Sequence, residues 1–245
     1  MSKLTNKIAL VTGGNSGMGL ATAKLFKEQG AKVIITARSN ETFQKAQTEY
    51  GQVFDVVQTD VSNLAELDRL YAHIKKTYGR LDVVFANAGI GQFAPSTEIT
   101  PEIFDNLFNT NVRGLYFTVT KALPLLATGS SVILNASTLS GKGMPGASAY
   151  SATKAAVRSF ARTWTAEVSP AHARFNVLSP GPIETPIYAK VGMTDEHKAG
   201  MASTFPAKRF GTSEEMANVA LFLASADSSF VNGSEILADG GFGNV

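Results

Sequence analysis

Short apolar runs rich in β-branched residues alternate along the chain with longer amphipathic stretches. The runs lie at 7–12, 32–37, 53–58, 81–86, 131–136, 174–179 and 235–239. Most do not alternate apolar with polar residues, which is typical of strands buried on both faces. Helices are predicted at 17–29, 40–50, 63–78, 101–126, 149–169 and 212–225. This alternation predicts right-handed βαβ units, and therefore a Rossmann-type α/β fold: a doubly wound parallel sheet of about seven strands with helices on both faces.

One region interrupts the alternation. Residues 180–211 contain four prolines and no clear strand. Long insertions of this kind are usually lids or binding loops, so we predict a substrate loop or lid over about 182–211. No linker or low-complexity segment divides the rest, which predicts one domain over residues 1–245.

Composition excludes several classes of function. The 22 Lys and Arg residues are interleaved with 20 Asp and Glu residues, for a net charge of +2. Binding to a phosphate backbone needs a clustered basic face, so we expect no nucleic-acid partner. The chain has no cysteine, which excludes thiolate nucleophiles and cysteine metal sites. The three histidines, His73, His172 and His197, lie far apart, and we expect no metal.

Targeting signals are not evident in the sequence. The first residues lack the apolar core of a signal peptide. No apolar run reaches the roughly 20 residues of a transmembrane helix. We therefore expect no membrane association and a cytoplasmic location.

A glycine-rich turn joins the first predicted strand to the first predicted helix. It reads Thr-Gly-Gly-Asn-Ser-Gly-Met-Gly over residues 12–19. Glycine lets the backbone approach a pyrophosphate, and a helix N-terminus offers free N–H groups and a positive dipole. The spacing differs from the usual G-x-G-x-x-G, and a turn without a ligand is the alternative. The strand before it and the helix after it favour a dinucleotide-binding domain.

Arg38 stands where many dinucleotide sites place an acid, just after the second predicted strand. A carboxylate there would repel a 2′-phosphate, whereas a guanidinium would bind it. This favours NADP(H) as the cofactor, with NAD(H) as the alternative. A solvated arginine before a helix capped by Ser39 or Asn40 is the structural alternative.

Tyr150 and Lys154 lie four residues apart at the start of a predicted helix, and therefore on one face. A nearby cation lowers the pKa of a phenol, so the pair could transfer a proton to or from an alcohol or carbonyl. Ser137 follows the strand at 131–136, at the carboxyl end of the sheet, where α/β folds bind ligands. Its hydroxyl could hydrogen-bond a substrate oxygen, or cap a turn.

Taken together, the motifs resemble those of the short-chain dehydrogenase/reductase superfamily over essentially the whole chain. The resemblance rests on TGGNSGMG (12–19), Asp60 in TDVS, NAG (87–89), Asn111 in NTNVRG, Ser137 in NAS, YSATK (150–154), SPGPIET (179–185) and DGG (239–241). Their order and spacing are all present. Among members, the chain broadly resembles the carbonyl reductases and the 3-oxoacyl-carrier-protein reductases.

The resemblance implies a catalytic set of Asn111, Ser137, Tyr150 and Lys154. Tyr150 would be the general acid in reduction and the base in oxidation. Lys154 would lower the pKa of Tyr150 and hold the nicotinamide ribose. Ser137 would orient the carbonyl, and Asn111 would break the helix at 101–126 locally and anchor a water that relays protons to Lys154.

The same resemblance implies the residues that bind the cofactor. Those at the pyrophosphate, ribose and adenine end would be Gly13, Asn15, Ser16, Gly17, Met18, Gly19, Arg38, Asp60, Val61, Asn87, Ala88 and Gly89. Those at the nicotinamide end would be Tyr150, Lys154, Pro180, Gly181, Ile183 and Thr185.

Residues flanking the expected pocket are mostly apolar, which suits hydrophobic ketones or secondary alcohols. The predicted substrate contacts are Ser137, Leu139, Met144, Tyr150 and Tyr188. We therefore predict an NADP(H)-dependent oxidoreductase that reduces small ketones. The alternatives are an NAD(H)-dependent alcohol dehydrogenase, a 3-oxoacyl-carrier-protein reductase, and a nucleotide-binding sensor without chemistry. Members of the family usually assemble as homotetramers, which the resemblance implies here.

Overall fold

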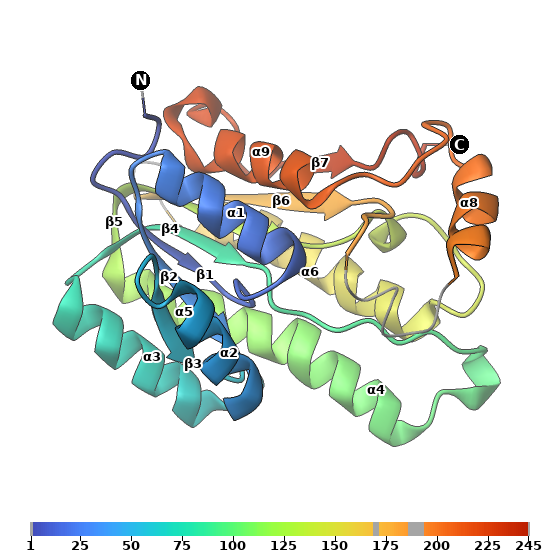
Figure 1. Ribbon diagram of the computed structural model, residues 1–245, viewed down its shortest axis with the longest axis horizontal. Helices are drawn as coiled ribbons and strands as arrows, with labels where there is room; N and C mark the ends of the chain where they lie inside the picture. The colour runs from blue at the N-terminus through green and yellow to red at the C-terminus, as the bar shows by residue number, and fades with distance from the viewer. Residues whose placement is uncertain (1, 169–171, 186–193, 245) are drawn as a thin grey trace.

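A single parallel sheet of seven strands forms the centre of the computed structural model, which describes residues 2–168, 172–185 and 194–244 (Figure 1). The strand order is β3-β2-β1-β4-β5-β6-β7. The strands are β1 (Ile8–Val11), β2 (Lys32–Ala37), β3 (Asp55–Gln58), β4 (Leu81–Ala86), β5 (Leu126–Asn135), β6 (Ala173–Pro180) and β7 (Glu235–Ala238). The order reverses between β1 and β4, so the predicted doubly wound fold is confirmed.

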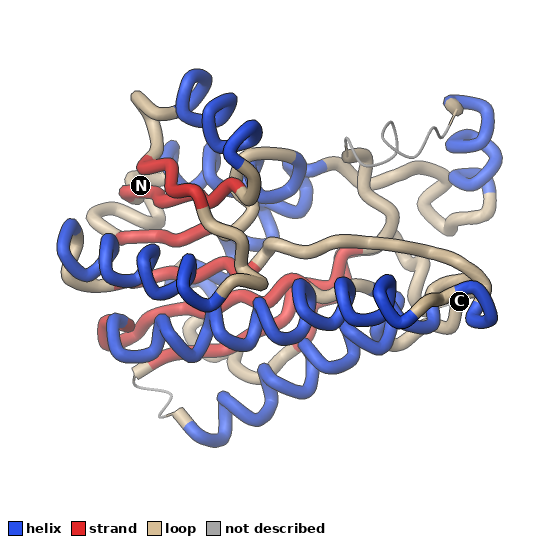
Figure 2. Tube along the Cα trace, turned by 90° about the horizontal axis from the view of Figure 1, so that it is seen from below, coloured by secondary structure: helices blue, strands red, loops and turns tan. Residues whose placement is uncertain are grey.

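Helices cover both faces of the sheet (Figure 2). One apolar layer joins the sheet to α3 (Leu64–Thr77), α5 (Leu115–Ala122) and α6 (Ser148–Glu167). The other joins it to α1 (Gly17–Glu28), α2 (Asn40–Tyr50) and α9 (Ser213–Ala224), and α1 and α9 lie side by side in Figure 1. Burial of these two layers is the main favourable contribution to folding.

Helix starts follow the local sequence. The Thr212 hydroxyl accepts a hydrogen bond from Glu215 N, while the Glu215 carboxylate accepts one from Thr212 N, which makes a capping box at the start of α9. At α4 (Pro101–Phe108), Thr100 accepts from Ile103 N and Pro101 occupies the first turn.

The helix predicted at 101–126 is not continuous. It divides into α4, a π-helical turn at Asn109–Gly114, and α5, which ends at Ala122. Leu123 begins a short 3-10 turn that contains Pro124, a residue that cannot continue the hydrogen-bond ladder. Strand β5 then begins at Leu126, earlier than the predicted start at 131, because Leu126 pairs with Leu81.

The two ends of the predicted substrate loop or lid, residues 182–211, lie next to each other. Ile183 pairs with Gly211 in an isolated parallel bridge, and Gly211 N donates to Pro182 O at 3.0 Å. Within its described part, the segment forms α8 (Asp195–Ser203), which lies apart from the sheet in Figure 1. Residues 186–193 lie outside the described residues.

Candidate active site

The sequence motifs gather at the carboxyl ends of the strands. Thr12 follows β1, Asn87 follows β4 and Ser137 follows β5 shortly after its last residue. β1 and β4 are the neighbours at which the strand order reverses. In open α/β sheets, ligands bind at this point.

Three positions of the glycine-rich turn at residues 12–19 favour glycine. Gly13 and Gly17 have φ values of 63° and 50°. A Cβ on Gly19 would lie 2.3 Å from Gly13 O, closer than two such atoms can approach. The first turn of α1 has no acidic residue and no side-chain cap from Ser16. The result is an open cradle of backbone N–H groups that fits the pyrophosphate of a dinucleotide.

Thr12 joins the glycine-rich turn to the segment after β4. Its hydroxyl accepts hydrogen bonds from Asn87 N and Ala88 N, both at 3.0 Å. Asn87 Nδ2 donates to Thr12 O at 2.9 Å, and Asn135 Nδ2 donates to Asn87 Oδ1 at 3.1 Å. Thr12 and Asn135 were not among the predicted site residues. Both could have been found in the sequence as a polar residue at the end of an apolar run.

Arg38 lies directly after β2 and is exposed. Ser39 caps α2 by accepting a hydrogen bond from Thr42 N, so of the two candidate cap residues, Ser39 and Asn40, the first is the cap. The Asp60 carboxylate accepts from Ser62 N and Ser62 Oγ at 2.9 and 2.7 Å, which fixes the turn that leads to buried Val61. All three predicted residues therefore lie at the β2–β3 end of the sheet.

The predicted catalytic side chains come together beside Gly89. Tyr150 and Lys154 lie on successive turns of α6, and Lys154 Nζ is 5.7 Å from the centre of the Tyr150 ring. The Ser137 side chain hydrogen-bonds the Tyr150 hydroxyl. A Cβ on Gly89 would lie 3.2 Å from Asn111 Oδ1 and 3.5 Å from Lys154 Nζ.

Burial changes the acidity of the two titratable groups. It raises the pKa of Tyr150 above its ordinary value, while the hydrogen bond from Ser137 acts in the opposite direction. Burial lowers the pKa of Lys154 to about 8. Lys154 Nζ is held by Asn135 O at 2.9 Å. Near neutral pH the lysine is therefore protonated.

Asn111 lies in the π-helical turn and is 1% exposed. Its Oδ1 accepts from Ile90 N at 2.8 Å, and its Nδ2 donates to Ile90 O at 2.9 Å and to Thr153 Oγ1 at 3.2 Å. The asparagine thus binds the segment after β4 to α6. Extra residues in a helical turn are often found at functional sites.

The predicted substrate contacts are only partly described. Leu139 is buried in the short turn after Ser137, and Met144 is half-buried. Tyr188 lies outside the described residues. Phe93, which was not among the predicted substrate contacts, packs on Tyr150 with ring centres 5.2 Å apart and is half exposed. It adds an aromatic side chain beside the catalytic phenol.

The predicted nicotinamide-end residues lie along the end of β6 and just beyond it. Pro180 is the last residue of β6, and Ile183 is buried in the apolar layer that contains α9. A Cβ on Gly181 would lie 2.6 Å from Asp239 Cβ, so the backbone passes close to the segment after β7. Thr185 is half-buried.

No helix in the described ranges is long and apolar enough to span a bilayer. Within those ranges, no three His, Asp or Glu side chains gather as metal ligands do.

Known proteins match this chain along its length. A family model described as Enoyl-(Acyl carrier protein) reductase matches residues 13–243. Oxidoreductase asL5 of Sarocladium schorii is 44% identical over 247 residues, covering 100% of this chain and 99% of that protein. A solved short chain dehydrogenase/reductase family protein has a TM-score of 0.89 and 38% identity, covering 99% of this chain and 100% of that one. The chain belongs to the short-chain dehydrogenase/reductase superfamily.

Two further members show the range within the superfamily. The 3-oxoacyl-(acyl-carrier-protein) reductase FabG of Thermotoga maritima is 35% identical over 244 residues, with 98% of each chain covered. A gluconate 5-dehydrogenase from Burkholderia cenocepacia, solved with NADP and tartrate, has a TM-score of 0.90 and 28% identity, covering 99% and 97%. The present short-chain dehydrogenase/reductase is therefore an oxidoreductase that acts on CH–OH and C=O groups with NAD(P).

Proposed function

We propose that this short-chain dehydrogenase/reductase uses NADP(H) to reduce small hydrophobic ketones to secondary alcohols, reversibly. The observation that carries the proposal is the arrangement of Ser137, Tyr150 and Lys154 beside the glycine cradle. The nicotinamide supplies the hydride when bound. Exposed Arg38, at the end of β2, supports a 2′-phosphate over a free ribose.

Each side chain has one task in the proposed reaction. The Ser137 hydroxyl donates to the carbonyl oxygen and holds it beside Tyr150. Tyr150 then gives its phenolic proton to the developing alkoxide, and takes it back when an alcohol is oxidised. Lys154 favours the resulting phenolate through its charge. Asn111 holds the backbone of Ile90 and anchors a water that returns a proton toward Lys154.

The surroundings support a hydrophobic substrate. Phe93 covers one side of Tyr150, and Leu139 and Met144 follow Ser137 in the chain. The segment at 182–211, with its ends joined through Ile183 and Gly211, would serve as the lid. Tyr188 would be its contact with the substrate.

We also propose a cytoplasmic homotetramer. Tyr116 on α5 is 37% exposed and packs on Phe160 and Trp164 of α6, with ring centres 5.3 and 5.6 Å away. An exposed aromatic group on these two helices suits a subunit contact. Light scattering of Tyr116→Glu should show smaller species than the wild type does; an unchanged mass would remove this surface from the proposed assembly.

The catalytic role is tested by Tyr150→Phe. Loss of the phenolic proton should lower kcat for an aryl ketone with NADPH by about 10²- to 10⁴-fold. Binding of NADPH, followed by its fluorescence, should persist. The matched control is Tyr116→Phe, which removes a hydroxyl from an exposed tyrosine outside the site.

The outcomes separate the candidate functions. Retained activity in Tyr150→Phe would contradict the mechanism. Wild-type turnover with NADH but not NADPH would support the proposed reaction and contradict the proposed preference for NADP(H). A wild type that prefers acyl thioesters over ketones would indicate a carrier-protein reductase, as FabG is named. Cofactor binding without turnover of any carbonyl would indicate a sensor.

A further inference from the structure

The turn that carries Ser137 is too short to hold itself in place. It continues as one 3-10 turn at Thr138–Ser140, in which Ser137 Oγ accepts from Leu139 N at 3.2 Å and Ser140 N donates to Ser137 O at 2.8 Å. Such short turns have poor hydrogen-bond geometry. Next to Ser137, the Thr138 hydroxyl donates to Asp239 Oδ2 at 3.0 Å. The position of the Ser137 hydroxyl therefore depends on this contact and on what holds the other end of the turn.

Glu235, the first residue of β7, holds that end. Its Oε1 accepts from Ser140 Oγ at 3.2 Å and from Ser179 Oγ at 2.6 Å. Ser179 precedes Pro180 at the end of β6. One carboxylate thus joins the Ser137 turn to the strand that leads into the predicted nicotinamide segment.

Arg158 closes the arrangement from the third side. It lies on α6, one turn beyond Lys154 and two beyond Tyr150. Its Nε is 2.5 Å from Glu235 Oε2, and its Nη1 donates to Ser140 O at 3.2 Å. The two side chains are 28% and 17% exposed, so solvent screens this ion pair less than a surface pair.

We propose that Glu235 and Arg158 are positioning residues that hold the Ser137 turn at a fixed distance from the helix that presents Tyr150 and Lys154. Neither residue has a contact with Ser137, Tyr150 or Lys154 among those the structure records, so both act through Ser140. The inference rests on the proposed function and adds to it two residues outside the reacting set.

The test compares kcat in Glu235→Ala, Glu235→Gln and Arg158→Met. A small displacement of a positioned group can cost up to about 100-fold in rate, so we expect kcat for the ketone to fall by about 10-fold or more in Glu235→Ala. KM for NADPH should change less than kcat does, because the glycine cradle is far from β7 in the sheet and Glu235 reaches the predicted nicotinamide segment only through Ser179. Glu235→Gln should recover part of the rate, since its amide oxygen still accepts from the two serines.

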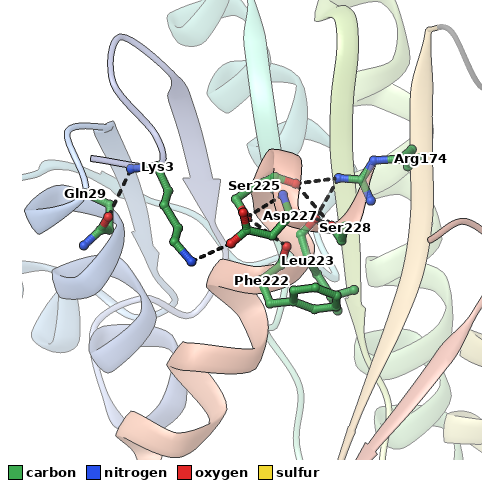
Figure 3. A network of polar contacts seen from close by, with 8 residues as sticks. All are labelled: Lys3, Gln29, Arg174, Phe222, Leu223, Ser225, Asp227 and Ser228. Atoms are coloured by element: carbon green, nitrogen blue, oxygen red, sulfur yellow. Dashed lines mark hydrogen bonds and ion pairs between the residues drawn. The ribbon is translucent and has the colours of Figure 1, made fainter. Parts of the chain in front are cut away.

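A matched control exists on the opposite side of the molecule. Asp227, just after α9, pairs with Lys3 at 2.5 Å, within a network that includes Arg174 near the start of β6 (Figure 3). This pair lies near the amino ends of the strands. Asp227→Ala removes an acid and an ion pair without touching the Ser137 turn, so its kcat should stay within about 2-fold of the wild type.

Hydrogen exchange gives a reading that needs no turnover. The amides of Ser140, Gly141 and Lys142 donate within the turn, to Ser137 O or Thr138 O. They should exchange faster in Glu235→Ala and Arg158→Met, with peptides from β1 and β4 unchanged. If the wild type is inactive on every carbonyl, the proposed function is wrong. The hydrogen-exchange result would then test on its own whether Glu235 and Arg158 hold the Ser137 turn.

Three results would overturn the inference. One is a kcat in Glu235→Ala and Arg158→Met within about 2-fold of that in Asp227→Ala. Another is faster exchange spread evenly over the chain, which would indicate general destabilisation. The third is unchanged exchange at residues 140–142 in both variants.

Discussion

At the residue scale, Tyr150 experiences two opposing influences on its acidity. Burial raises its pKa, and the hydrogen bond from Ser137 lowers it. Ser137→Ala removes the lowering influence, so the pKa of Tyr150 should rise further. Alcohol oxidation needs the phenolate, and its pH–rate profile should therefore move to higher pH. Ser148→Ala changes an exposed serine on α6, the helix that carries Tyr150, and should leave the pH–rate profile unchanged. Equal profiles for the two variants would contradict the assigned effect of Ser137 on the pKa of Tyr150.

Arg38 carries the prediction of cofactor choice. Arg38→Asp should shift the ratio of kcat/KM from NADPH toward NADH by about 10-fold or more, because a carboxylate repels the 2′-phosphate. Lys32→Asp makes the same kind of charge reversal at the opposite end of β2, where the side chain is also exposed. Steady-state kinetics with both cofactors would measure the ratio. A similar shift in both variants would assign the effect to net charge rather than to contact.

At the element scale, the π-helical turn depends on Asn111. Asn111→Ala would leave the N–H and C=O of half-buried Ile90 without these partners, at a cost of about 2 kcal/mol in the free energy of unfolding. Urea denaturation would measure this cost. Asn109→Ala changes an exposed asparagine in the same turn and should stay within about 0.5 kcal/mol of the wild type. Equal losses in both variants would mean that the turn does not depend on the side chain of Asn111.

Sequence patterns predicted this fold best where burial alone decides the structure. Strands β1 and β2, which are buried apart from Lys32, read as continuous apolar runs. Thr100 and Thr212, which cap α4 and α9, are residues of the type that is preferred at a helix start. The amphipathic stretch at 101–126 has a continuous helical period, so periodicity could not show where the π-helical turn divides it. The family resemblance placed a break at Asn111, and the π-helical turn at Asn109–Gly114 contains that residue. Periodicity also could not show that Glu235 and Arg158 pair, because they meet only through the tertiary fold.

At the scale of the whole molecule, the buried charge of Lys154 opposes folding. Burial lowers the pKa of Lys154 from 10.5 to about 8, so keeping it charged in the folded chain costs free energy at neutral pH. Lys154→Met should therefore raise the free energy of unfolding at pH 7 by roughly 1–3 kcal/mol while abolishing turnover. Above pH 8 the folded wild type releases this proton before the unfolded chain does. The advantage of methionine should shrink between pH 8 and 10.5, and thermal unfolding at several pH values would measure it. A constant difference across that range would contradict a neutral lysine in the folded state.

Strand order governs when the site can form during folding. β1 pairs with β4, and the chain between them must first complete β2, β3 and the helices that connect them. Pairings between distant segments form late, because closing the intervening loop costs entropy. Thr12 and Asn87 meet across this seam, so a half-folded chain would hold the glycine-rich turn without the catalytic side chains. Recovery of activity after denaturation would accordingly follow closure of the β1–β4 seam, and would lag behind the return of helical signal.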